Sequence, residues 1–391
     1  MSTDSVILKP GKDKPIRHRH HWIFSGAVAS FPEFEDGACL PVLSSQGEFL
    51  GSAYFNSKAK ILGRMVCFTK TSPLEAIFQH LNRALVLRRR FFNGHQTNAY
   101  RLINAEGDLL PGLVVDCYHC TLVVQFTTLG MERFRQPIID WLIQNMHPTC
   151  IYEKSLVPSR KEEGLKDQQG VLFGQVPSQA VEILEHGLRF HVSILHGQKT
   201  GFFLDHRQMR HKIQELSQGK NVLNCFSYTG GFSVYAAAGG ANKVDSVDIS
   251  QSAINMAKQN MALNGFSSSQ HGYFAEDVFA FLREKPLDYG LVILDPPAFA
   301  KQKKDIVTAC RGYKDINRLA LQKMPSASLL LTSSCSYHVS EDLFQKVVFQ
   351  AAVESGRTVK IIGRHQLAVD HPLNVCHPES DYLKSLLLFV D

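Results

Sequence analysis

The sequence lacks any segment typical of a membrane span or a secretory signal. Its longest stretch without a charged residue, 221–242, is interrupted by polar residues and four glycines, so it does not form a continuous apolar run. The first residues, MSTDSVILKPGKDK, have no apolar region behind a basic one. We therefore expect a cytoplasmic protein with no membrane partner.

Disulfide frameworks, internal repeats and strong charge bias are also missing. The nine cysteines are an odd number without framework spacing, which favours free thiols in a reducing compartment. A composition of 44% hydrophobic and 20% charged residues excludes a disordered or collagen-like chain. Lys and Arg exceed Asp and Glu by only 6, but KPGKDKPIRHRH (9–20) concentrates the excess. We interpret this segment as a basic arm for a polyanion.

Three regions with different patterns follow one another along the 391 residues. Short apolar runs separated by Gly, Pro and Ser predict a small β-rich domain over 1–72. A helical pattern at 73–92 and strand-like runs around a helix near 131–146 predict an α+β domain over 73–192. Strands alternating with helices over 193–391 predict an α/β domain with a doubly wound, mostly parallel sheet.

A cofactor site is expected at the carboxyl ends of the first strands of this last domain. NVLNCFSYTGG (221–231) is a strand, a glycine-containing turn and a helix start, but it lacks the G-x-G-x-x-G spacing of dinucleotide sites. The next strand ends at Asp248, where a carboxylate can accept both ribose hydroxyls, although it could instead cap a helix, a role that Ser250 would fill better. The third ends near Asp277, a candidate for the adenine amine or for another helix cap. Ribose and adenine without phosphate suit S-adenosylmethionine.

A catalytic loop is expected at the end of the fourth strand, LVILDPPAF. Asp295-Pro296-Pro297 fixes the backbone twice and removes two amide donors, so the loop projects rigidly and can present Phe299 to a planar base. Asp295 could hydrogen-bond the base or only anchor the loop. The fifth strand ends in TSSCS (332–336), which brings Cys335 to the same edge of the sheet. A thiolate there could add to C6 of a pyrimidine and activate C5 for methylation, or the residue could be a small buried side chain.

These segments resemble the S-adenosylmethionine-dependent large-subunit (23S) rRNA cytosine-C5 methyltransferases of the type I family. The matching segments in the last half are GQKTGFFLDHR (197–207), VLNCFSYTGGFSV (222–234), VDIS (247–250), DPPAFAK (295–301), ACRGYKDIN (309–317), TSSCS, DLFQK (342–346), DHP (370–372) and YLK (382–384). LKPGKDKPIRHRHHWIFSGAV (8–28) and RLINAEGDLLPGLVVD (101–116) extend the likeness toward the N-terminus.

The resemblance implies an N-terminal PUA domain that binds RNA, a central EEHEE domain and a Rossmann-like catalytic domain. It implies Cys335 as the nucleophile, and because Ala298 stands where related enzymes carry a second cysteine, a one-cysteine mechanism. Two positions depart from the family pattern: Leu109 replaces a turn residue of the glycine type, and His206 replaces a glutamine. The implied partner is large-subunit rRNA, free or partly assembled, and a homodimer is left open.

Motifs and resemblance together give a full set of expected site residues. The catalytic residues are Cys335 and Asp295. The cofactor-binding residues are Phe203, Asp205, Phe226, Ser227, Tyr228, Thr229, Gly230, Asp248, Ile249, Ser250, Asp277, Val278, Asp295 and Pro297. The RNA-binding residues are Lys9, Lys12, Arg17, Arg19 and Phe299.

No metal site is expected. The run RHRHH (17–21) lacks the spacing of metal ligands and contains arginines that repel a cation, and Cys117-x-x-Cys120 has no second pair. Two other functions stay open: methylation of an exocyclic amine, for which Cys335 would be dispensable, and a non-catalytic RNA-binding protein with a methyltransferase fold. The target nucleotide, cytosine versus uracil, the base that removes the C5 proton and the oligomeric state do not follow from the sequence.

Overall fold

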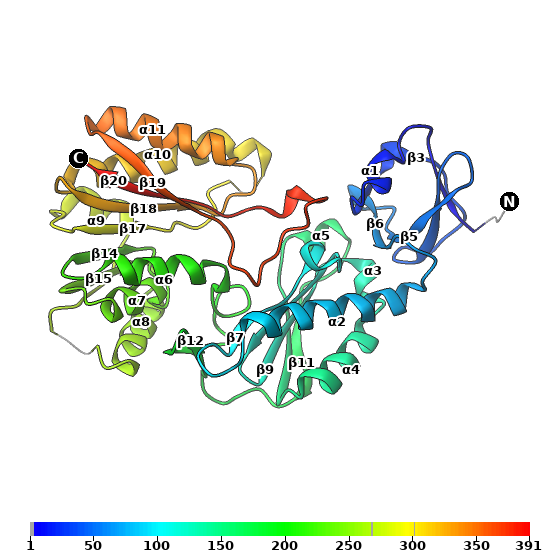
Figure 1. The fold of residues 1–391 in the computed structure, drawn as a ribbon, viewed down its shortest axis with the longest axis horizontal. Helices are drawn as coiled ribbons and strands as arrows, with labels where there is room; N and C mark the ends of the chain where they lie inside the picture. The colour runs from blue at the N-terminus through cyan, green and yellow to red at the C-terminus, as the bar shows by residue number, and fades with distance from the viewer. Residues whose placement is uncertain (1–3, 267–268, 301) are drawn as a thin grey trace. The chain divides into compact units, whose positions relative to one another are not determined.

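The computed structural model describes residues 4–266, 269–300 and 302–391, so Lys301 at the end of DPPAFAK lies outside it (Figure 1). The chain divides into two compact units. The first comprises the residues up to Leu184, Val192–Asp205 and Val369–Ser380, and the second comprises Glu185–His191, His206–Ala368 and Asp381–Asp391. Within the described part of the chain, no helix is both long and apolar enough to cross a membrane.

A six-stranded sheet with its own apolar core forms the beginning of the first unit. The strand order is β2-β6-β5-β4-β1-β3, and the paired strands are antiparallel except β1 and β4, which are parallel. The elements are β1 (Val6–Leu8), α1 (Lys14–Arg17), β2 (Trp22–Phe24), β3 (Val28–Ser30), β4 (Cys39–Leu43), β5 (Phe49–Phe55) and β6 (Ile61–Cys67). Side chains such as Val6, Ile23 and Phe55 close this core. The short strands and intervening turns are those that the sequence pattern indicates.

A five-stranded sheet, ordered β11-β10-β9-β8-β7, forms the rest of the first unit. Its elements are α2 (Pro73–Phe91), β7 (Ala99–Asn104), β8 (Leu113–Tyr118), β9 (Thr121–Phe126), α3 (Leu129–Glu132), α4 (Arg135–Met146), β10 (Cys150–Ser155), α5 (Ser159–Glu162) and β11 (Gln168–Gly174). Strands β8 to β11 with α4 follow the expected E-E-H-E-E order, preceded by β7. The hydroxyl of Ser72 caps α2 by accepting a bond from the Glu75 amide, and Pro73 occupies the first helical position.

The segment Val369–Ser380 belongs to the first unit although it lies near the end of the chain. Arg88 makes a bidentate ion pair with Asp108 at 2.6 and 2.7 Å and also donates to the Asp370 carbonyl at 2.8 Å. A Cβ on Gly107 would overlap the carbonyl oxygen of Pro372. Leu109, which follows, has a φ of 61°, so this leucine does adopt the left-handed turn that a glycine usually supplies.

A seven-stranded sheet, ordered β16-β15-β14-β17-β18-β20-β19, forms the second unit. Its strands are β14 (Asn221–Cys225), β15 (Lys243–Asp248), β16 (Gly272–Ala275), β17 (Leu291–Leu294), β18 (Ser328–Ser334), β19 (Val359–His365) and β20 (Lys384–Val390). Its helices are α6 (Arg207–Leu216), α7 (Gly231–Ala238), α8 (Gln251–Leu263), α9 (Val278–Glu284), α10 (Ile306–Lys323) and α11 (Glu341–Ser355). Two further strands, β12 (Val181–Glu185) and β13 (Leu188–Val192), form a two-stranded sheet.

The strand order of this sheet reverses at β14. Strands β16, β15, β14, β17 and β18 run parallel, and β20 is antiparallel to both of its neighbours. The chain passes from β14 to β15 on one side and reaches β17 on the other, so the two crossovers diverge at the carboxyl end of β14. Ligands of doubly wound folds bind at such a point. The expected α/β fold with a mostly parallel sheet is confirmed.

The buried pair of Arg88 and Asp108 provides a stability test. Replacing Asp108 with alanine leaves the guanidinium buried without its carboxylate, so we expect a loss of about 3–5 kcal/mol of unfolding free energy. Urea denaturation followed by circular dichroism measures this loss. The control is Glu35→Gln, which removes the exposed 2.9 Å pair with Arg133 in the same unit and should cost less than about 1 kcal/mol. Equal losses in the two variants would contradict the structural role of the buried pair.

Candidate active site

The loop after β14 is held in a strained conformation by β15 and α8. Phe226 and Tyr228 have φ values of 57° and 46°, which non-glycine residues adopt only when the surroundings enforce them. The Ser227 amide donates to the Val247 carbonyl at 3.0 Å. Gly230 has a φ of 78°, and a Cβ there would come 2.8 Å from the Cβ of Ala257. The loop therefore approaches α8 more closely than a larger residue would allow.

Asp248 links this loop to the end of β15. Its two carboxylate oxygens accept bonds from the amides of Tyr228 and Ser250, each at 2.9 Å. Each oxygen keeps a second lone pair that can accept a bond from a ligand hydroxyl. Ile249 beside it is 75% exposed. An exposed apolar side chain next to a fixed carboxylate suits a ligand with a flat apolar face and neighbouring hydroxyls.

Two helices, α8 and α9, begin at this edge, and their capping residues bear on the expected roles of Asp248 and Asp277. Ser250 caps α8, accepting from the Ala253 amide at 3.3 Å, so Asp248 is not needed for that cap. Asp277 caps α9, accepting from the Ala280 amide at 2.9 Å. Its expected contact with the adenine amine stays a prediction. Val278 is 2% exposed and packs in the core of the second unit, and its expected cofactor contact stays a prediction.

Ser227 carries a buried hydroxyl that no protein group satisfies. Within the described residues, its Oγ has no hydrogen-bond partner. Unsatisfied buried polar atoms are costly and call for an explanation such as a bound ligand. Together with Asp248, this atom shows that the loop fits a ligand with several polar groups.

The DPP loop and the loop after β18 meet at the same sheet edge. The thiol of Cys335 donates to the carbonyl of Pro296 at 3.8 Å. The Ser336 hydroxyl accepts a bond from the Ala300 amide at 3.1 Å and lies 2.9 Å from the hydroxyl of Tyr313 on α10. Ser336 therefore fixes the two loops against each other. Ser336 is the last residue of the TSSCS motif, but the motif does not indicate that this serine joins two loops.

Phe299 and Pro297 differ in what they expose. The ring of Phe299 packs at 4.7 Å from the ring of Tyr313 and at 6.3 Å from that of Phe279. Phe299 is thus partly buried against the core of the second unit, and only part of it can face a base. Pro297 is exposed. Their expected contacts with RNA and cofactor stay predictions.

Asp295 has an ionisable neighbour that the family pattern does not suggest. The Nε2 atom of His206 lies 3.3 Å from Oδ1 of Asp295. His206 stands where the resemblance expects a glutamine, so this departure falls next to a candidate catalytic carboxylate. The imidazole can hold the Asp295 carboxylate in one orientation.

The sequence does not single out Lys384 as a site residue, because only its membership of the YLK segment is visible there. Lys384 begins β20, is buried, and donates to the carbonyls of Ser336 at 3.0 Å and Tyr382 at 2.8 Å. Burial lowers the pKa of Lys384, whereas the charges of Asp381 and Cys335 act to raise it. The lysine therefore interacts electrostatically with the thiol. It is a candidate for the cation that a nucleophilic cysteine needs.

The remaining expected residues lie in the first unit. Phe203 and Asp205 follow Thr200, whose hydroxyl donates to Asp116 at 2.6 Å and so anchors the GQKTGFF segment within that unit. Their cofactor contacts stay predictions.

The basic arm forms a cleft in the first unit. A cavity of about 660 Å³ is lined by Gly11, Lys12, Lys14, Pro15, His18, His20, Val375 and Cys376. Lys9 and Arg19 are absent from this lining. Arg17 is paired with Asp13 at 2.6 Å and Glu48 at 2.5 Å, so its charge is partly neutralised.

Comparison with known proteins gives matches over both units. Residues 6–68 match the family model of a PUA-like domain, and residues 166–353 match that of an S-adenosylmethionine-dependent methyltransferase. The ribosomal RNA large subunit methyltransferase I of Alteromonas mediterranea is 43% identical over 389 residues, with 98% of each chain covered. The protein of the same name from Aeromonas salmonicida is 40% identical, also with 98% of each chain covered.

Two solved methyltransferase structures are similar to this chain over nearly its whole length. A chain from Streptococcus mutans described as a SAM-dependent methyltransferase is 26% identical, with a TM-score of 0.83 over 98% of this chain and 99% of that one. A methyltransferase structure complexed with SAH is 26% identical, with a TM-score of 0.85 and the same coverage.

The position of Lys384 leads to a test of thiol reactivity. Replacing it with methionine removes the neighbouring positive charge, so the fraction of Cys335 present as thiolate should fall and its alkylation by iodoacetamide should slow roughly tenfold. Site-resolved mass spectrometry gives the rate for each cysteine. The exposed Cys120 is the internal reference and should react as before. An unchanged ratio of the two rates in a folded variant would remove Lys384 from the site.

Proposed function

Since the chain belongs to the ribosomal RNA large subunit methyltransferase I family, we propose that it methylates C5 of a cytosine in large-subunit rRNA through a covalent bond to Cys335. Family membership rests on relatives of 40–43% identity over nearly the whole chain. The cofactor is S-adenosylmethionine, as in the family model that matches residues 166–353.

S-adenosylmethionine, when bound, supplies a methyl group on a positively charged sulfur. In our proposal, Asp248 holds its ribose hydroxyls and Ile249 packs against its adenine. The buried hydroxyl of Ser227 contributes a further polar contact, and the strained backbone of the 226–230 loop lies along the ligand. The observed bonds of Asp248 to two backbone amides support this role, because they hold the carboxylate in one orientation.

The proposed chemistry uses the sulfur of Cys335 as a nucleophile. Its thiolate forms a bond to C6 of the cytosine, and the ring electron pair displaced to C5 attacks the methyl carbon, which leaves its sulfonium sulfur. Loss of the C5 proton to a base then restores the C5–C6 double bond and expels the thiolate. Asp295 would hydrogen-bond the base and stabilise the adduct, with His206 keeping the carboxylate in place.

One observation carries this proposal: the thiol of Cys335 lies against the Pro296 carbonyl of the DPP loop. A loop that binds a planar base and a thiol that can add to it are thus brought together. Lys384 supports the same chemistry, because its charge favours the thiolate. Methylation of an exocyclic amine would need neither the sulfur nor the lysine.

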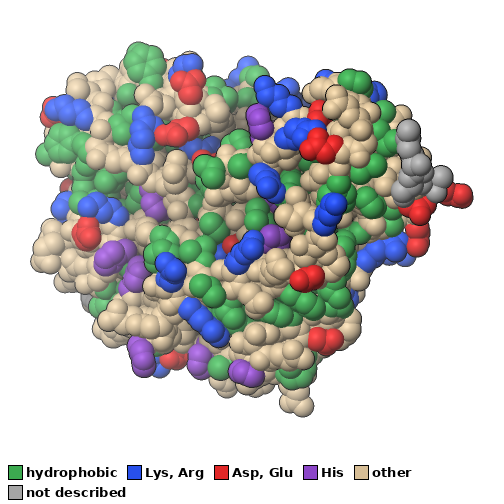
Figure 2. Space-filling view, turned by 45° about the vertical axis from the view of Figure 1, so that its right-hand side comes forward, with side chains coloured by type: hydrophobic (Ala, Val, Ile, Leu, Met, Phe, Trp, Pro, Cys, Tyr) green, Lys and Arg blue, Asp and Glu red, His purple; other side chains and the backbone are tan. Residues whose placement is uncertain are grey.

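Basic surface in the first unit supports an RNA partner. Lys12, Lys14 and His18 line the cleft described above, and phosphates bind such groups. Figure 2 shows Lys and Arg side chains spread over the visible face, interspersed with Asp, Glu and apolar ones.

Trapping with a fluorinated base tests the covalent step. RNA carrying 5-fluorocytosine at the target should stay bound to the enzyme after methyl transfer, because fluorine cannot leave as a proton does. Cys335→Ala should neither form this complex nor transfer methyl groups. The complex is detected as a denaturant-resistant band that contains both RNA and protein.

The control for this experiment is Cys310→Ala, a half-buried cysteine on α10 in the same unit. It should trap and methylate RNA like the unmodified protein. Full methyl transfer by folded Cys335→Ala would overturn the proposal and favour the exocyclic-amine alternative.

The ribose contact is tested by Asp248→Asn. This change keeps the size of the side chain but replaces one acceptor oxygen with a donor group, so we expect affinity for S-adenosylhomocysteine to fall roughly 10- to 100-fold. Isothermal calorimetry measures the affinity. Gln251→Ala, whose side chain bonds Asn255 on the next turn of α8, should leave it unchanged. Equal affinities for Asp248→Asn and the unmodified protein would remove the ribose assignment.

A further inference from the structure

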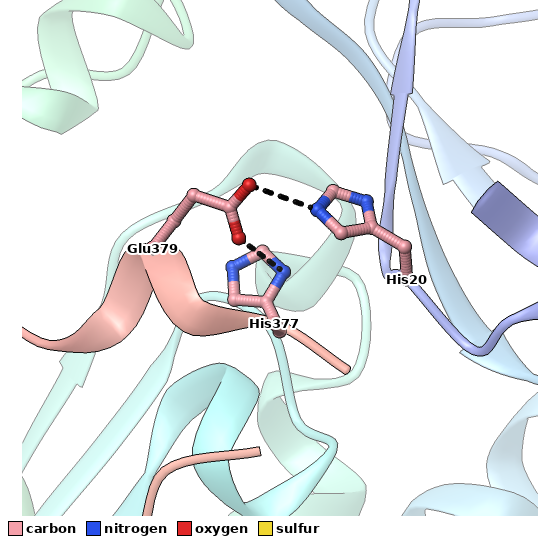
Figure 3. A group of neighbouring side chains, drawn as sticks. All are labelled: His20, His377 and Glu379. Carbon is pink, nitrogen blue, oxygen red and sulfur yellow. Dashed lines mark hydrogen bonds and ion pairs between the residues drawn. The ribbon is translucent and has the colours of Figure 1, made fainter. Parts of the chain in front are cut away.

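Three side chains from opposite ends of the sequence converge in the first unit. His20 comes from the basic arm, and His377 and Glu379 come from the segment Val369–Ser380. One ligand atom of each lies within 4.8 Å of the others. Figure 3 shows the carboxylate of Glu379 between the two imidazole rings, with one oxygen directed at each. We propose that these three residues form a binding site for a divalent transition metal of the zinc class.

The distances are close to those of a coordinated ion. Oε1 of Glu379 lies 3.1 Å from Nε2 of His20, and Oε2 lies 3.6 Å from Nδ1 of His377. Ligands at 2.0–2.1 Å from a tetrahedral zinc ion are separated by about 3.3 Å. Only small side-chain movements are therefore needed to reach that geometry. Two nitrogens and one oxygen leave a fourth position for water.

His377 is the observation that points to a ligand. It is completely buried, and within the described residues neither of its ring nitrogens has a hydrogen-bond partner. A buried imidazole without such a partner is costly, and metal coordination would satisfy it.

His20 is held in place by contacts with the backbone of Trp22. Nδ1 of His20 lies 3.4 Å from the Trp22 carbonyl and 3.2 Å from the Trp22 amide. Metal binding at Nε2 would select the tautomer with a protonated Nδ1, which gives up the bond from the Trp22 amide and donates to the Trp22 carbonyl instead, an arrangement common for metal-bound histidine.

The surrounding charges favour a cation overall. Arg64 is the positive neighbour of His377, but it is ion-paired with Glu163 at 2.5 Å. Glu106 acts on His377 with the opposite sign and accepts a bond from the Trp22 indole at 3.0 Å. The site therefore has three carboxylates around it, those of Glu106, Glu163 and Glu379, and one guanidinium. The adjoining cleft, which His20 and Cys376 help to line, offers an entry path.

A bound ion would join two distant parts of the chain. It would connect His20, two residues before β2, to the segment that follows β19, so its binding free energy would stabilise the first unit. The sequence could not indicate this site, because His20 and His377 are far apart in the chain and the local RHRHH run has no ligand spacing.

The test uses the full-length chain without an affinity tag, stripped of metal with a chelator and titrated with zinc chloride in a calorimeter. We expect one equivalent to bind with micromolar or better affinity, and plasma mass spectrometry should find one zinc per chain after dialysis. His377→Asn and Glu379→Gln should each weaken binding at least about tenfold. His95→Asn removes an exposed histidine elsewhere in the first unit and should bind zinc as the unmodified protein does.

Thermal unfolding with and without zinc supplies a second readout. Zinc should raise the melting temperature of the unmodified chain and of His95→Asn, but not that of Glu379→Gln. The glutamine retains a hydrogen-bond acceptor for His20, so this variant tests the charge rather than the fold. A hydrogen-bonded cluster without metal would give variants with changed stability and no stoichiometric zinc binding in any of them. That result, or binding that survives both ligand substitutions, would overturn the proposal.

Discussion

The reversal of strand order at β14 is the constraint on which the rest of the candidate site depends. Because β15 and β17 lie on opposite sides of β14, the loops that follow these three strands open around one point. β18 adds the loop with Cys335 to the same edge, since it runs parallel to β17. The backbone topology thereby brings a carboxylate, the DPP loop and a thiol to one edge of the sheet, before any side-chain contact is made.

Hydrogen bonds then hold these loops in fixed positions. Asp248 holds the loop after β14 through two backbone amides, and Ser336 joins the DPP loop to the loop after β18. Ser336 is completely buried and serves only to hold the loops together. Asp248 is partly exposed and keeps spare acceptor capacity, so it can also meet a ligand without a large rearrangement, which lowers the entropy cost of binding.

Local patterns predicted much of this fold, and long-range pairing decided the rest. The helical periodicity at 251–263 corresponds to α8, and the Ser-Pro signal marks the start of α2. The placement of Cys335 at the DPP loop followed from the rule that parallel strands end at one edge. Lys384 could not be found this way, because β20 enters the sheet antiparallel, and no local pattern shows which strand it will pair with. The return of Val369–Ser380 to the first unit is equally invisible in the sequence.

The burial of Lys384 argues for an electrostatic role over a structural one. Removing an ammonium group from water is expensive, and a methionine of similar shape could fill the same space at lower cost. The two carbonyls that it bonds offset only part of that expense, which is why burial lowers the pKa of Lys384. The charges of Asp381 and Cys335 offset a further part, and that of Asp381 is the larger. In the proposed mechanism, the charge that is costly to bury would favour the thiolate form of Cys335.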